Sequence, residues 1–349
     1  MYVLVDVQTK EENMKERIKW IDVMKFFGIF EIYLGHFGAQ AGRAGDFVWG
    51  YHVAMFFLIS GCMENLNTED NIVKYAIKKA KTILVPCFFF ACLTVALGVI
   101  QNGYGLGYIK GSLILIAKGI VRNSFENVGL WFLTCLFSIQ LIFFLIRKLK
   151  YKPLILMGCF GLYYVALVIL PVNPMYSPSW FYNVDSALFY ILYYAIGYVA
   201  YPYIVKLFVL DTIKKKVIFG VSGLFALAYT IGAYFGLDLI ASTIMLPPNM
   251  GIIYSVFSAS VIIWAHFIVA RLLQEVKIFV EIGKNTLYLC GNEYIVKSLV
   301  ADLATLFGIH FVAGHPIQIY LYVGILLLVI NRCFVPVERY LIGKVVREV

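Results

Sequence analysis

Long apolar segments follow one another along nearly the whole chain, and they restrict what it can fold into. We identify ten in the 349 residues, each near the ~20 residues that a helix needs to cross a bilayer. They are too long for strands, and their Gly and Pro residues lie mostly near their ends, so we interpret them as helices. They cover residues 20–37, 46–63, 83–100, 128–146, 153–171, 184–204, 217–236, 251–271, 286–308 and 316–335.

The composition excludes a water-soluble fold. Hydrophobic residues make up 62% of the chain and charged residues only 14%, against about 45–50% and about 25% in soluble domains. One core cannot hide that much apolar surface from water. We therefore predict an all-α, polytopic membrane bundle of about ten transmembrane helices. It forms a single domain over residues 1–349, with a polar N-terminal segment 1–19 and a tail 336–349.

The basic residues are distributed unevenly between the two sides of this bundle. Segments 1–19, 64–82, 147–152, 205–216, 271–285 and 332–349 carry 23 of the 29 Lys and Arg residues, and the segments on the other side carry four, Arg43, Lys110, Lys118 and Arg122. Because Lys and Arg collect on the cytoplasmic side, we expect both termini in the cytoplasm. This distribution explains the net charge of +9 without a nucleic-acid partner.

Two further features concern the remaining loops and the cysteines. The outer segment 101–127 contains a shorter apolar stretch, 108–121, which we expect to be a re-entrant or interfacial helix. The seven Cys residues include no CxxC pair, so we interpret them as small apolar residues and expect neither disulfides nor a metal site.

The first apolar segment carries four ionisable residues, Asp22, Lys25, Glu31 and His36. Such groups are costly inside a bilayer and are functional candidates for that reason. On a helix, Lys25 lies roughly 16 Å from His36 along the axis, so the cation is near the cytoplasmic face and the imidazole near the outer face. His52, on the next helix, is expected at a depth similar to that of His36. The alternative is that each His only caps a helix or hydrogen-bonds a neighbour.

Several motifs in this order resemble the integral-membrane acyltransferase 3 family. Lys25 and His36 match its basic residue, ten-residue spacer and His, and Met55-Phe-Phe-Leu-Ile-Ser-Gly61 resembles its Phe-Phe-x-x-Ser-Gly signature. His52 is typical of the branch similar to fucose O-acetylases. Further matches are Lys78 and Lys81 ahead of Pro86, which resemble an Arg-x-x-Arg motif, Leu130-Trp-Phe-Leu133, and Ile282-Gly-Lys-Asn-Thr-Leu287.

The resemblance implies acyl transfer from acyl-CoA, most often acetyl-CoA, to a hydroxyl of an envelope carbohydrate. His36 is then the candidate general base, since imidazole accepts a proton near neutral pH, with His52 as its partner. The candidates for binding the coenzyme A phosphates are four cations at or near the cytoplasmic face, Arg17, Lys25, Lys78 and Lys81. At the last three of these positions the family usually has Arg, and this chain has Lys. Lys keeps the positive charge but lacks the planar group with which Arg binds a phosphate through two hydrogen bonds.

The residue that stabilises the oxyanion is left open among His52, Trp131 and Asn292. The late family His is missing, and Gly291-Asn292-Glu293 takes its place. Glu293 and Lys297, four residues apart on one helix face, form either a structural ion pair or part of the site. A covalent acyl-His step and direct transfer both remain open.

We therefore predict a multi-pass O-acyltransferase of a cell membrane, specifically a bacterial plasma membrane. Acetyl-CoA serves as co-substrate, no cofactor is permanently bound, and an envelope glycan or lipid-linked sugar is the acceptor. Two other classes fit the same features: a glycan or lipid transporter (flippase), and a sensor domain that keeps the fold without catalysis. Transporters often consist of two related halves, and we find no such repeat.

Overall fold

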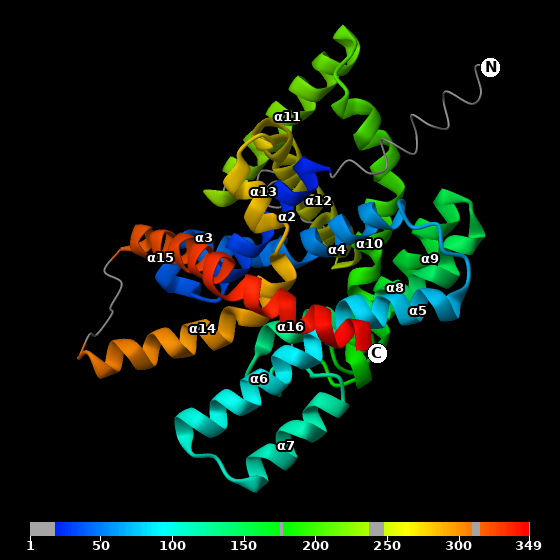
Figure 1. Ribbon diagram of the computed structural model, residues 1–349. Coiled ribbons are helices and arrows are strands. Elements are labelled where there is room, and N and C mark those ends of the chain that lie inside the picture. The colour runs from blue at the N-terminus through cyan, green and yellow to red at the C-terminus, as the bar shows by residue number, and fades with distance from the viewer. Residues whose placement is uncertain (1–17, 175–176, 237–247, 309–314, 349) are drawn as a thin grey trace, which may run out of the picture.

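A computed structural model describes residues 18–174, 177–236, 248–308 and 315–348 (Figure 1). Within these ranges the chain is helical and contains no strand, which confirms the all-α prediction. The α-helices are α2 (Lys19–Gly35), α3 (Arg43–Phe47), α4 (His52–Glu64), α5 (Ile72–Lys79), α6 (Val85–Asn102), α7 (Leu106–Ala117), α8 (Trp131–Ile146), α9 (Lys152–Tyr164), α10 (Val184–Phe208), α11 (Ile213–Tyr234), α12 (Pro248–Leu273), α13 (Lys277–Gly283), α14 (Thr286–Leu306), α15 (Pro316–Val329) and α16 (Val335–Glu348).

Fewer helices qualify as simple membrane spans than the ten expected. In the described residues, seven segments are long and apolar enough, and an eighth is obtained if the pair Arg43–Gly50 and His52–Glu64, bent by 42°, counts as one span. The seven are Ile72–Asn102, Val128–Leu149, Lys152–Ile169, Phe181–Phe208, Ile213–Tyr234, Gly251–Leu273 and Pro316–Val346.

The two other expected spans, 20–37 and 286–308, coincide with α2 and α14. Helix α2 has only 17 residues, and α14 contains Glu293, Lys297 and Asp302. These helices carry most of the ionisable groups that the sequence places inside the membrane, so their polar side chains set them apart from the purely apolar spans.

Helix α7 is the short helix expected in the outer segment. Its 12 residues fall short of a membrane crossing, and it folds back against α6 as a hairpin that extends away from the bundle (Figure 1). The chain leaves α6 through Gly103, whose φ of 64° lies in the left-handed region that glycine adopts without a steric penalty.

The core is formed around a direct backbone contact between α4 and α10. A Cβ atom on Gly61 would lie 1.9 Å from the carbonyl oxygen of Tyr194, and a Cβ on Gly197 would lie 1.9 Å from that of Leu58. The two helices therefore depend on glycine at both positions, as small-residue interfaces between membrane helices do.

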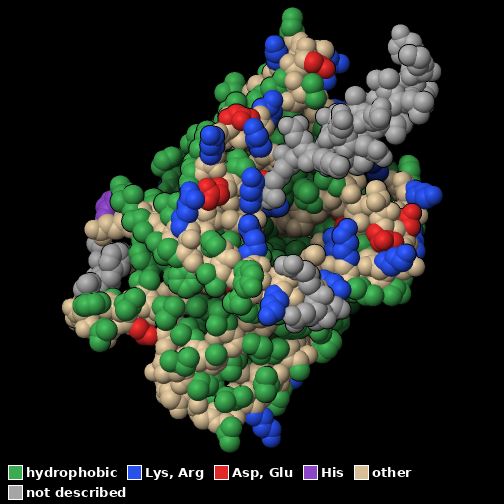
Figure 2. All heavy atoms as spheres, in the orientation of Figure 1, with side chains coloured by type: hydrophobic (Ala, Val, Ile, Leu, Met, Phe, Trp, Pro, Cys, Tyr) green, Lys and Arg blue, Asp and Glu red, His purple; other side chains and the backbone are tan. Residues whose placement is uncertain are grey.

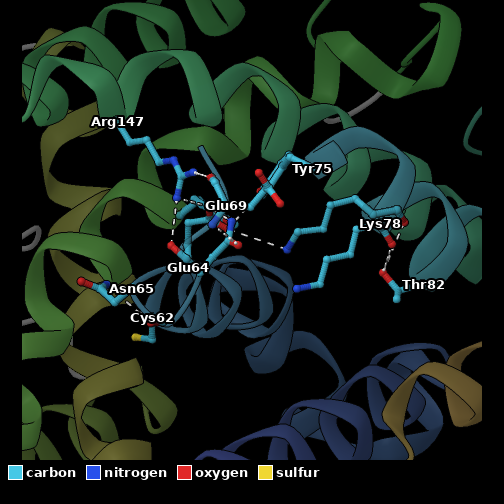
Figure 3. A network of polar contacts seen from close by, with 11 residues as sticks. Cys62, Glu64, Asn65, Glu69, Tyr75, Lys78, Thr82 and Arg147 are labelled. Carbon is cyan, nitrogen blue, oxygen red and sulfur yellow. Dashed lines mark hydrogen bonds and ion pairs between the residues drawn. The ribbon is translucent and has the colours of Figure 1, made fainter. Parts of the chain in front are cut away.

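A buried carboxylate links four helical segments. Glu64, at the end of α4, is 2% exposed, and Figure 3 shows Arg147 and Tyr75 converging on it. Arg147 donates from Nη1 at 3.0 Å, and the hydroxyls of Tyr75 and Tyr194 donate at 3.0 and 3.1 Å. Lys79 Nζ lies 3.7 Å away. These partners satisfy the charge of a carboxylate that would otherwise be costly to bury.

Basic side chains gather on one face of the molecule. Figure 2 shows Lys and Arg around a hollow in the face on which α5, α16 and the start of α2 lie. The expected tail from residue 336 contributes to this face as helix α16, which packs against α6 and α14. All seven cysteines are free, five of them buried and Cys92 and Cys333 exposed.

Candidate functional site: a His–Glu pair beside an aromatic cavity

The connection between α2 and α4 brings two histidines to either side of one tryptophan. This connection is compact, because a Cβ on Gly45 would lie 2.0 Å from the carbonyl oxygen of Gly38. The ring of Trp49 lies 6.2 Å from that of His36 and 5.2 Å from that of His52, measured between centroids. The two imidazoles therefore lie close to the same indole ring, and their similar depth in the membrane stays a prediction.

His36 is paired with a carboxylate from a distant helix. Its Nδ1 lies 2.7 Å from Oε1 of Glu293 on α14. The Glu293 side chain is 7% exposed and that of His36 is 30% exposed. Lys297, one turn further along α14, donates to the same Oε1 at 2.5 Å. Glu293 thus takes part both in the ion pair foreseen from the sequence and in a contact that the sequence did not indicate.

This geometry fixes the chemistry of the His36 ring. An ionised carboxylate only accepts hydrogen bonds, so Nδ1 carries the hydrogen and donates it to Glu293. In the neutral ring, Nε2 then has a lone pair that can take a proton. The arrangement matches the orienting pair of a catalytic triad, in which the carboxylate sets the tautomer and stabilises the imidazolium that forms.

His52 is held in a defined tautomer as well. It is 1% exposed, and its Nδ1 donates to the carbonyl oxygen of Val48 at 2.6 Å. A neutral imidazole has one N–H, so Nε2 of His52 is an acceptor. The neutral ring can accept a hydrogen bond from a hydroxyl, but it has no N–H left to donate to an oxyanion.

Both histidines line a large cavity, which has a volume of about 740 Å³. Its wall includes six Phe, Tyr and Trp side chains, among them Trp131 on α8 and Tyr190 on α10. The guanidinium of Arg122 lies over the Trp131 ring, 3.5 Å from its centroid, a cation–π stack. Arg122 and the two imidazoles are the ionisable basic groups of the described lining, which contains no carboxylate.

A second, smaller cavity reaches the other side of His36. It measures about 240 Å³ and is lined by His36, Glu293 and Lys297 together with polar residues of the segment before α8, Glu126 among them. Residues 128–129 also line both cavities. The imidazole of His36 therefore lies in the wall between two spaces, and two substrates can approach it from different directions.

Glu31, which lies on α2, belongs to a separate cluster. Glu31 Oε1 lies 2.8 Å from Nε2 of His266 on α12 and accepts a hydrogen bond from the Tyr51 hydroxyl at 3.0 Å. His266 is therefore a hydrogen-bonded histidine of the core. None of the three lines the large cavity.

Of the four predicted phosphate-binding cations, the three that the structure describes do not come together at this site. Arg17 lies outside the described residues. Lys25 is half-buried on α2, Lys78 is exposed on α5, and Lys81 is half-buried in the π-helical turn Ala80–Leu84. None of these three lines either cavity at His36, so their role in binding coenzyme A stays a prediction.

The candidates for oxyanion stabilisation occupy different places. Trp131 lines the large cavity. Asn292 is fully buried outside it and donates from Nδ2 to the Tyr288 carbonyl and, at 2.6 Å, to Glu338 of α16. Both of its amide hydrogens are thereby used. Arg122 lines the large cavity as well, and the sequence does not single it out as a site residue. There it stands only among the four cations of the outer segments.

In the described part of the chain, no group of three or more His, Cys, Asp or Glu side chains is arranged to hold a metal ion.

One comparison with known proteins covers the whole site. A family model described as an acyltransferase domain matches residues 18–332, a range that includes the His–Glu pair and both cavities beside it. No curated protein and no solved structure matches the chain.

Proposed function

Because this match shows that the chain belongs to the integral-membrane acyltransferase 3 family, we propose that it is a membrane-bound O-acyltransferase with His36 as its general base. The acyl group, acetyl in the simplest case, comes from cytoplasmic acyl-CoA. The acceptor is a hydroxyl of a cell-envelope carbohydrate, free or lipid-linked. Within the family, His52 supports our assignment of the chain to the branch similar to fucose O-acetylases.

The observation that carries this proposal is the pair of His36 and Glu293 in the wall between two cavities. A sugar hydroxyl is a weak nucleophile and needs a base within hydrogen-bond reach. The 2.7 Å contact holds the ring in the tautomer that a base requires. Lys297 supports the pair by keeping the buried carboxylate ionised through their 2.5 Å contact.

The proposed step is direct transfer. Nε2 of His36 takes the hydroxyl proton while the hydroxyl oxygen attacks the thioester carbonyl carbon. The tetrahedral intermediate then collapses, the carbon–sulfur bond breaks, and the imidazolium returns its proton to the leaving thiolate. The products are the acyl ester and the free thiol of coenzyme A. Glu293 stabilises the imidazolium that exists between the two proton transfers.

The large cavity is the proposed acceptor site. Its volume of about 740 Å³ falls within the range of small-molecule pockets, and its aromatic wall suits the apolar faces of sugar rings. The neutral His52 ring offers an acceptor for a sugar hydroxyl, and Arg122 offers a positive charge. We place this cavity toward the outer side of the membrane and the acyl donor on the cytoplasmic side.

The test compares cell-envelope glycans by mass spectrometry with and without the protein, and with the variant His36→Ala. We expect the wild-type protein to increase the glycan mass by one acyl group and the variant to cause no increase. The size of the increase identifies the acyl group of the donor, and the modified glycan identifies the class of product. The purified wild-type protein should also release free thiol from acetyl-CoA in the presence of the acceptor.

The matched control is His315→Ala, because His315 is an exposed histidine at the start of α15, away from both cavities. It should retain wild-type acylation. Full acylation by His36→Ala would refute the base role. Movement of an unmodified glycan across proteoliposomes, without any acyl transfer, would refute the enzyme and favour a transporter.

A further inference from the structure

A third cavity lies at the N-terminal end of α14. It measures about 290 Å³ and is formed where α13 meets α14 and where the π-helical turn Ile330–Phe334 joins α16. Three cations line it, Lys284, Arg332 and Arg339, against the single carboxylate of Glu281. Arg339 lies beyond the residues that the family model matches.

The floor of this cavity is a buried amide network. Nδ2 of Asn285 donates to Oδ1 of Asn331 at 2.6 Å, and Nδ2 of Asn331 donates to Glu281 at 3.1 Å. Arg339 donates to Oδ1 of Asn285, and Arg332 Nη2 lies 3.1 Å from Oε2 of Glu281. The guanidinium groups are thereby held at the rim by ordered partners.

The charge of the cavity suits a polyanion. One ion pair accounts for Glu281 and Arg332, and Lys284 has no ion pair with another described residue. The lining therefore keeps an excess of two positive charges. Arg presents a planar fork that binds phosphate bidentately, and Lys adds a point charge. The cavity lies on elements of the basic face that Figure 2 shows.

Its distance from His36 fits the length of an acyl-CoA molecule. Asn285 at the cavity and Glu293 at His36 are eight residues apart along α14, a rise of about 12 Å. The arm between the pyrophosphate and the sulfur of coenzyme A is as long as roughly four extended residues, about 14 Å. The end of α13 also packs on the start of α2, since a Cβ on Gly283 would lie 1.8 Å from the Asp22 carbonyl oxygen.

We propose that this cavity, lined by Lys284, Arg332 and Arg339, binds the nucleotide phosphates of the acyl-CoA donor. The pantetheine arm then runs along α14 to the smaller cavity beside His36. This assignment rests on the proposed function, because it supplies the donor site for that reaction. It replaces Lys78 and Lys81 as the main phosphate contacts and predicts that those two contribute little.

The test measures binding and turnover separately in purified protein in neutral phosphatidylcholine nanodiscs. Lys284→Ala is the main variant, since this exposed side chain can be removed without breaking an ion pair among the described residues. Its Kd for coenzyme A should rise about tenfold, which corresponds to about 1.4 kcal/mol. Lys216→Ala, which removes another exposed lysine at the start of α11, should leave the Kd unchanged.

Turnover distinguishes phosphate binding from general damage. Lys284→Ala should lower kcat/KM about tenfold with acetyl-CoA and leave it unchanged with S-acetyl-pantetheine, which has the thioester but lacks the nucleotide. Lys284→Glu should have the same selectivity and a larger effect. Lys216→Ala should behave like the wild-type protein with both donors.

Three results would overturn the assignment. They are an unchanged Kd for coenzyme A in Lys284→Ala, an equal loss of activity with both donors, and a selective loss in the double variant Lys78→Ala/Lys81→Ala instead. Coenzyme A binding that requires an anionic lipid, or that anionic lipid headgroups abolish, would assign the cavity to lipid phosphate and contradict the proposal. A wild-type protein that binds coenzyme A at this cavity but transfers no acyl group would refute the proposed function alone.

Discussion

Replacing Glu293 by Gln isolates the contribution of the His36 partner to catalysis. The substitution keeps the shape of the side chain and a hydrogen-bond acceptor for Nδ1 of His36, which lies 2.7 Å from Oε1. It removes the negative charge that faces the imidazolium once His36 has taken the substrate proton. We therefore expect the substitution to lower kcat while leaving the KM for acyl-CoA near its wild-type value.

The size of the effect follows from the geometry. Two unit charges about 4 Å apart attract each other by about 4 kcal/mol at an effective dielectric constant of about 20. The His36 side chain is 30% exposed, so solvent screens part of this attraction, and we reduce it to about 2.7 kcal/mol. A loss of that size in the transition state corresponds to an approximately 100-fold lower kcat.

The assay follows thiol release from acetyl-CoA by purified protein at saturating acceptor. The variant His36→Ala gives the background rate. A matched control is Glu31→Gln, because Glu31 forms a similarly buried pair with His266 at 2.8 Å away from the cavities. It should change kcat by less than about threefold, near the scatter expected for distant sites. The double variant His36→Ala/Glu293→Gln should be no slower than His36→Ala, since residues acting as a unit are not additive.

Two outcomes would refute this reasoning. If Glu293→Gln retains kcat within about threefold of the wild-type value, the carboxylate does not stabilise a charged His36. If Glu31→Gln is as slow as Glu293→Gln, the loss reflects damage to the bundle and not the chemistry at His36.

Three further substitutions test other parts of the structure. Arg122→Lys keeps the charge but loses the planar stack, so the KM for the acceptor should rise about fivefold to tenfold with the acyl-CoA KM unchanged, measured by steady-state kinetics. Gly61→Ala should lower the thermal unfolding temperature in detergent sharply, because the added methyl meets the α10 backbone, whereas Gly158→Ala, with open space around it, should not. Arg147→Ala should destabilise the fold by about 3–5 kcal/mol, because it leaves the buried Glu64 without its main partner, and equilibrium unfolding should show no such loss in Glu64→Gln/Arg147→Gln.

The sequence predicts the helices well because their signals are local. Apolar runs of membrane-spanning length locate nine of the ten expected segments on helices of matching position, and the tenth, 46–63, is divided by the bend before His52. The closeness of His36 and His52 to the same Trp49 ring also follows from a local fact, namely the short connection between α2 and α4.

The partners of these side chains were not predictable in the same way. Glu293 is 257 residues from His36, and its sequence neighbourhood shows only the local spacing to Lys297. Arg122 lies in a segment whose charges look solvated, and only the folded chain places its guanidinium on Trp131. The cavity at Lys284 and Arg339 likewise combines residues from separate loops. Contacts between distant segments depend on how helices pack, which apolar periodicity does not encode.

The glycine contact between α4 and α10 limits how the acceptor cavity can open. With Gly61 and Gly197 each pressed against the other helix's backbone, neither helix can slide along its neighbour without a steric collision. His52 and Tyr190 therefore belong to one rigid wall. In the described residues of the facing wall, built from α9 and α12, no glycine is pressed against a neighbouring backbone. The proposed glycan acceptor would therefore enter and leave by displacing that side of the bundle.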